Sequence, residues 1–298
     1  MERETLLATL LLVLGGAAVQ PLVLLPRRAL GDRSPQVAER RAWRQLWVPL
    51  LPLFLLGAWL AGWALREPDP VPDRVAPGVL LAASVPFVVV AIRAAVRAVW
   101  ALVRAPRDLP IYTAGLVRPR VVFSPFLARS LEEGPVRAAW EHEQAHVRHR
   151  DPLRIWLAQI ATDLQWPWPG AHRRFAAWLE ILECARDDEA RGCGASGLDL
   201  AAAVLAIARA ASAGSPRRGV AQGMAIDAGL IGSGRALQER IARLSSPLPE
   251  IAVPPVRTRL GSAVPWAVAV AMLLCAGAVG AAWGEPVLRP ILAWTGSL

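Results

Sequence analysis

Long apolar runs alternate with polar stretches along the chain and divide it into membrane-like and soluble parts. Four runs are long enough to cross a bilayer, which takes about 20 apolar residues. They cover about residues 6–25, 45–65, 75–95 and 263–284. The pattern predicts a mainly α-helical, polytopic membrane protein with four transmembrane helices. We expect three of them in residues 1–103, a soluble domain in residues 104–261, and the fourth with a short tail in residues 262–298.

The arginines predict an orientation for these helices. The stretch of residues 26–44 carries six arginines and only two acidic residues, whereas residues 66–74 are net acidic. Because cytoplasmic loops carry an excess of basic residues, the first stretch is expected inside and the second outside. The soluble domain then faces the cytoplasm of a bacterial cell. The first residues, MERE, lack the basic start of a signal peptide, which favours a retained first helix.

Composition supports this membrane prediction. The chain is 54% hydrophobic, its mean hydropathy is +0.36, and its net charge of +9 comes from arginines, since it has no lysine. The arginines flank apolar runs and form no basic stretch interleaved with exposed aromatics. We therefore expect contact with the lipid bilayer and no direct binding of nucleic acid. Three cysteines provide no disulfide framework.

A short polar stretch contains the pattern H-E-x-x-H. His142 and His146, two of the chain's four histidines, lie four residues apart on a predicted helix from about Pro135 to Arg150. Residues i and i+4 share one helix face, so both imidazoles can reach one metal ion. Such a site keeps an open position for water, and Glu143 would take a proton from that water. The pattern predicts one zinc ion per chain.

The third ligand is expected on the predicted helix of residues 173–192. Glu183 lies beside an apolar stripe on this helix, where a carboxylate needs a partner such as a metal. Asp187, one turn later, could accept the free ring N–H of a ligating histidine. Cys184 and His172 are alternative ligands. Solvated surface charge is the other interpretation of Glu183, as it is of the neighbouring carboxylates Glu180, Asp188 and Glu189.

Two further elements are predicted around the H-E-x-x-H helix. Two short extended runs around a Gly turn, the second at residues 117–123, indicate a small β-hairpin. The hairpin could bind a peptide along its edge, or it could simply pack on the helix. Residues 153–168 form an apolar stretch with Arg154, Asp163 and tryptophans, which is typical of a helix at the membrane surface.

A set of motifs in one order resembles the integral-membrane metallopeptidases of the BlaR/MecR antirepressor type. These motifs are GLVRPRVVFSP, EHEQAHVRHRDPL, LQWPWP, ECARDDEA and ALQERIARLSSP. The resemblance implies a cytoplasmic, gluzincin-like zinc endopeptidase domain. Receptors of that family are switched by an extracellular sensor and cleave themselves or a transcriptional repressor. In this chain Arg186 replaces the usual cysteine, and the tail after residue 284 is too short for a penicillin-binding sensor, so no β-lactam receptor role is expected.

Several alternatives stay open at this point. The substrate is expected to be a cytoplasmic or membrane protein, including a repressor, and homo-oligomers are compatible with the sequence. A peptidase similar to HtpX quality-control enzymes would share the same residues. A non-catalytic signalling or scaffold protein with a vestigial metal site would need the ligands but not Glu143. Candidates for stabilising the oxyanion include Tyr112, His172 and several arginines.

Overall fold

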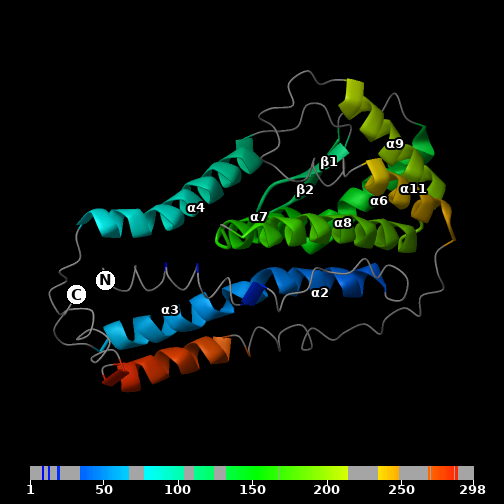
Figure 1. The fold of residues 1–298 in the computed structure, drawn as a ribbon. Helices are drawn as coiled ribbons and strands as arrows, with labels where there is room; N and C mark the ends of the chain where they lie inside the picture. Colours follow the sequence, from blue (N-terminus) through cyan, green and yellow to red (C-terminus); the bar gives the residue numbers. More distant parts are fainter. Residues whose placement is uncertain are drawn as a thin grey trace.

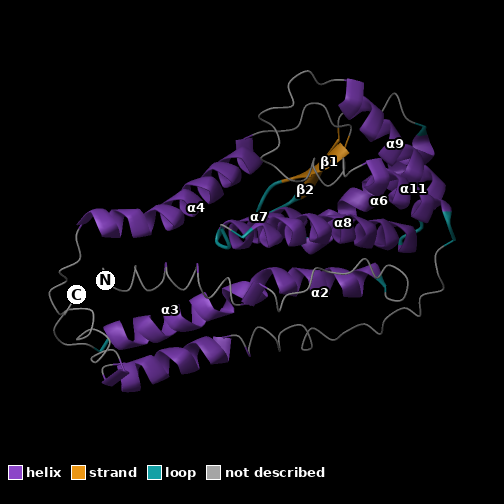
Figure 2. Ribbon diagram, viewed as in Figure 1, coloured by secondary structure: helices purple, strands orange, loops and turns teal. Residues whose placement is uncertain are grey.

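The computed structural model describes residues 34–66, 77–103, 111–123, 132–166, 168–213, 234–247 and 270–284, with single positions at 9, 13, 19, 20, 268, 286 and 287. The described chain is mainly helical, with one antiparallel pair of short strands (Figure 2). This confirms the predicted fold class at the level of a helical protein with a small hairpin. The predicted first span, residues 6–25, lies largely outside the described residues.

The second predicted span is part of a longer helix. Helix α2 (Pro35–Trp47) continues through a short 3₁₀ turn (Val48–Leu50) into α3 (Leu51–Ala64), giving 30 residues of uninterrupted helix. Sequence reasoning treated residues 26–44 as a loop, and for residues 35–44 this is wrong. Proline at the first helical position favours the start at Pro35. The polar half of this helix, α2, packs along α8 (Pro169–Gly192).

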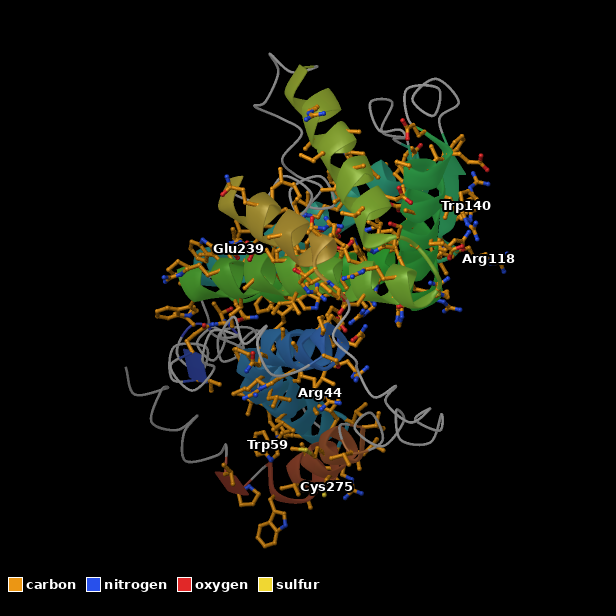
Figure 3. All side chains as sticks on the ribbon, turned by 90° about the vertical axis from the view of Figure 1, so that its right-hand side faces the viewer. Arg44, Trp59, Arg118, Trp140, Glu239 and Cys275 are labelled. Carbon is orange, nitrogen blue, oxygen red and sulfur yellow. The ribbon has the colours of Figure 1, made fainter. Side chains whose placement is uncertain are left out.

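Two described helices are long and apolar enough to cross a membrane. They are Pro35–Ala64 and the central part of α4 (Pro77–Val103), residues Leu81–Trp100. A shorter apolar helix, Val270–Gly284, coincides with the predicted fourth span. This helix lies beside α3 (Figure 1), and Figure 3 shows Trp59 next to the helix of Cys275, far from Trp140 of α6 (Glu133–His149).

The region between α4 and the helix Val270–Gly284 is built around two helices. Helix α6 (Glu133–His149) and α8 (Pro169–Gly192) pack against each other, and α7 (Asp151–Asp163) connects them. Helix α9 (Gly197–Ala213), for which the sequence analysis made no prediction, covers α6, and α11 (Gly234–Ser245) covers α9 and α8 (Figure 1).

The hairpin was predicted correctly, with a shorter second strand. Strand β1 (Ile111–Ala114) pairs antiparallel with β2 (Arg120–Phe123) in the register Thr113↔Val121, and Gly115 between them has φ 98°. Both strands pack on α6. Strand β1 is buried, whereas β2 is exposed at both of its ends.

The largest apolar cluster joins α2 to the domain. Fully buried Trp178 of α8 lies against Ala42 and Leu46 of α2 and against Ala158 of α7. Helix α7 was predicted at the membrane surface. Most of its residues are buried against α2, α4 and α8, and its position relative to a membrane stays a prediction.

Candidate metal centre

The structure brings His142 and His146 of α6 together with Glu183 of α8. The two Nε2 atoms lie 3.1 Å apart, and the Glu183 carboxylate oxygens lie 3.4 Å from Nε2 of His142 and 3.6 Å from Nε2 of His146. All three side chains are buried. A tetrahedral ion with bonds of about 2.0–2.1 Å has ligand-to-ligand edges of about 3.3–3.4 Å. The two distances to Glu183 run to different oxygens, Oε2 for His142 and Oε1 for His146. Each nitrogen-to-nearest-oxygen distance and the separation of the two nitrogens are close to such an edge, so these residues could hold a metal ion.

The two imidazole rings face each other in a way that requires a cation between them. Nδ1 of His146 lies 2.9 Å from Asp151, and Nδ1 of His142 lies 2.9 Å from Asp187. An ionised carboxylate only accepts hydrogen bonds, so each Nδ1 carries the proton, although the N–H of His142 is not well aligned with its acceptor. The Nε2 atoms of two neutral rings then point lone pairs at each other. A proton or a metal cation must lie between them.

On the His142 side, Asp187 is held by an arginine from another helix. Nε and Nη2 of Arg240, on α11, each lie 2.7 Å from one carboxylate oxygen of Asp187. Nη1 of the same guanidinium lies 3.1 Å from Glu183. Arg240 and Asp187 are both buried. One cation thus fixes the carboxylate behind His142 and the candidate ligand Glu183 together.

On the His146 side, Asp151 lies behind the histidine as Asp187 lies behind His142, and an arginine holds it in the same way. Arg186 donates to both of its carboxylate oxygens, over 2.5 and 2.9 Å. Arg150 has left-handed backbone angles, φ 52° and ψ 43°, which end α6 and start α7. The sharp change of direction brings Asp151 back to the histidine five residues before it. Each candidate histidine ligand therefore has its own aspartate and its own buried arginine.

The candidate general base is oriented by the hairpin. Thr113 of β1 donates its hydroxyl proton to Oε2 of Glu143 over 2.7 Å. Glu143 is half-buried and follows His142 directly on α6. Strand β1 packs on α6, so the hairpin positions a carboxylate next to the ligand cluster.

The ionisable side chains of the site shift one another's pKa values. Burial lowers the pKa of His142, but Asp187 and Glu183 outweigh this effect and raise it to about 10. Burial raises the pKa of Glu183, but Arg240 and the histidines outweigh it and lower the pKa to about 2. Arg186 and His146 likewise hold the pKa of Asp151 far below its usual range against the effect of burial. In the metal-free protein a proton on His142 thus serves as the cation between the rings.

The alternative residues lie elsewhere. His172 is exposed near the start of α8, and His149 pairs with Glu189 on an exposed part of the surface. The carbonyl of Cys184 accepts a hydrogen bond from Arg243, and burial raises the pKa of its thiol. The cluster among the described residues that could hold a metal ion includes neither Cys184 nor His172. Tyr112 is buried on β1.

Sequence reasoning missed Asp151, Arg240 and Thr113. Asp151 is the last residue of the EHEQAHVRHRD stretch, and it reaches His146 only because of the left-handed turn at Arg150. Arg240 lies in the ALQERIARLSSP motif on the same face as buried Leu244, a spacing that could have indicated a buried charge. Thr113 resembles any other strand residue in the sequence.

Comparisons of the chain with protein-family models, with curated proteins and with solved structures gave no match. The function is therefore argued from the geometry of the site and from the apolar helices.

Proposed function

We propose that this chain is a membrane-embedded zinc endopeptidase of the H-E-x-x-H type. The observation that carries the proposal is the convergence of two imidazole nitrogens and one carboxylate group in a buried site, with the two nitrogens 3.1 Å apart and a carboxylate oxygen 3.4 or 3.6 Å from each nitrogen. Two nitrogen ligands and one oxygen ligand from the protein, with one position left for water or substrate, form the donor set typical of catalytic zinc.

The other residues of the site have matching roles in peptide hydrolysis. A bound zinc ion would supply Lewis acidity to the peptide carbonyl and to water. Glu143 would accept the proton of the attacking water and deliver it to the leaving amine, and Thr113 would keep its carboxylate oriented. Asp187 and Asp151 would hold the two histidines in the tautomer that leaves Nε2 free to bind the ion.

The membrane part of the proposal extends the two described candidate spans to a four-helix arrangement. Residues 6–25 and 263–284 would supply the other two helices, and the catalytic domain would face the cytoplasm of a bacterial cell. The substrate would be a protein or peptide in the cytoplasm or membrane, including a cognate repressor. Helices α6 and α11 lie at the end of the molecule away from α3 and Val270–Gly284 (Figure 1), which agrees with chemistry performed outside the bilayer.

The test distinguishes the role of the general base from the role of the metal ligands. Glu143→Gln keeps the size of the side chain and its hydrogen bond from Thr113 but removes the base. We expect zinc content to stay near one ion per chain while proteolysis of a casein or membrane-protein substrate falls about a hundredfold or more.

Glu189→Gln on α8 is the matched control, because it makes the same change outside the ligand cluster, and we expect it to retain activity. Full activity of the Glu143 variant would contradict the proposed mechanism. Zinc binding by a wild-type chain without any peptidase activity would instead support a non-catalytic scaffold.

A further inference from the structure

Helix α2 reaches the metal centre through a short chain of charged side chains. Glu39, in the middle of α2, is buried although it lies on the helix that continues into the candidate span α3. Its carboxylate pairs with Nη2 of Arg154 on α7. Nη1 of the same arginine lies 3.0 Å from Oδ1 of Asp151, whose other oxygen lies 2.9 Å from Nδ1 of His146. Two side chains thus separate Glu39 from a candidate metal ligand.

The connection is held firmly in place. The guanidinium of Arg154 lies 4.9 Å from the ring centre of Trp43 on α2 and 5.8 Å from that of Trp178 on α8. Trp178 also donates its indole N–H to Glu39 over 3.0 Å. Cation–π contacts and buried ion pairs together leave Arg154 little freedom to adopt another position.

We propose that Glu39 is a positioning residue of the metal centre and that it orients His146 through Arg154 and Asp151. The inference rests on the proposed function, because it assumes that His146 binds the ion. It makes α2 part of the site, although this helix is over 90 residues from the H-E-x-x-H motif in sequence. A shift of the α2–α3 helix along or within the membrane would then change the affinity of the site for zinc.

Another ion pair on α7 provides a matched control. Asp163, at the opposite end of α7, is also buried and pairs with Arg97 of the membrane helix α4 over 2.5 Å. The two carboxylates therefore have similar burial and similar partners, and each ion pair joins α7 to a helix that belongs to a candidate membrane span. Only the Glu39 pair leads to Asp151.

The experiment measures zinc affinity by competition with a chelator and records the visible absorption of the cobalt-substituted full-length protein in detergent. Outer partners of metal ligands typically contribute ten- to a hundredfold, so we expect Glu39→Gln, two steps beyond the outer partner Asp151, to weaken zinc binding about three- to tenfold. The cobalt spectrum should shift, because the orientation of His146 changes. Asp163→Asn should leave both measurements unchanged.

A double-mutant cycle identifies the route. If Glu39 acts through Arg154, the double variant Glu39→Gln/Arg154→Gln should bind zinc as Arg154→Gln alone does. Additive losses, or a Glu39→Gln protein with wild-type affinity and spectrum, would overturn the proposal. Should Glu39→Gln fail to fold, Arg154→Lys keeps the charge but loses the double contact, and wild-type affinity in that variant would overturn it equally. A wild-type chain that binds no zinc would contradict the proposed function instead.

Discussion

At the scale of single residues, the site depends on which cation lies between His142 and His146. The raised pKa of His142, about 10 against an ordinary value of 6.5, means that the metal-free protein holds a proton there at neutral pH. The stability that this proton contributes is fully present below about pH 6.5. It is lost as the pH rises toward 10, because the folded state then releases the proton.

Zinc binding must displace this proton. We therefore expect the affinity for zinc to rise about tenfold per pH unit between pH 6.5 and 10, with release of about one proton from His142. Calorimetric titrations in buffers with different ionisation enthalpies measure the number of protons released. Binding at pH 7.5 with no proton release would contradict the assignment of His142 as a ligand.

The sequence predicted the residues of this cluster better than their surroundings. Helical geometry places histidines at i and i+4 on one face of a helix, and it places Glu183 beside an apolar stripe. In the structure, one ligand atom from each of these three residues lies within 4.8 Å of the other two. Asp187 could be placed for the same reason, because it lies one turn from Glu183. The contributions of Asp151 and Arg240 depend on a left-handed turn and on a separate helix, and neither follows from helical spacing.

At the scale of elements, the contact between α3 and the helix Val270–Gly284 depends on glycines. A methyl group on Gly62 would lie 1.9 Å from the carbonyl oxygen of Gly277, and one on Gly280 would lie 1.9 Å from that of Trp59. Backbones that approach so closely require small residues, as in many membrane helix pairs. Helix positions could be predicted from hydropathy, but this pairing could not.

This contact leads to a prediction with an internal control. Gly62→Ala should lower the free energy of unfolding by about 1–3 kcal/mol, because the added methyl group forces the two backbones apart. Gly57→Ala, on the same helix but with no atom within 4 Å of the new methyl group, should be neutral or stabilising by up to about 1 kcal/mol. Thermal unfolding in detergent compares the two variants. Equal stability of both would show that the close approach does not contribute.

At the scale of the whole molecule, the main difference from expectation is that α2, from the part of the chain predicted to hold membrane helices and short loops, packs on α8. An arginine-rich stretch between two apolar runs was interpreted as a loop, yet residues 35–47 are helical and pack on α8. The buried positions Glu39, Ala42 and Leu46 recur at helical spacing and could have indicated this. The loop was predicted from the charges, because arginines on the exposed side of an amphipathic helix resemble those of a cytoplasmic loop.

The molecule therefore joins one candidate metal centre to helices that are apolar enough to enter a membrane, with α2 shared between the two parts. The central claim is that His142, His146 and Glu183 together bind one zinc ion. The most direct measurement is the zinc content and zinc affinity of the purified full-length chain beside Glu183→Ala and Glu189→Gln. We predict about one zinc per chain for the wild type and Glu189→Gln, and affinity weakened about a hundredfold or more in Glu183→Ala, where two imidazoles remain. A wild-type chain without zinc, or a Glu183→Ala chain with undiminished affinity, would contradict the claim.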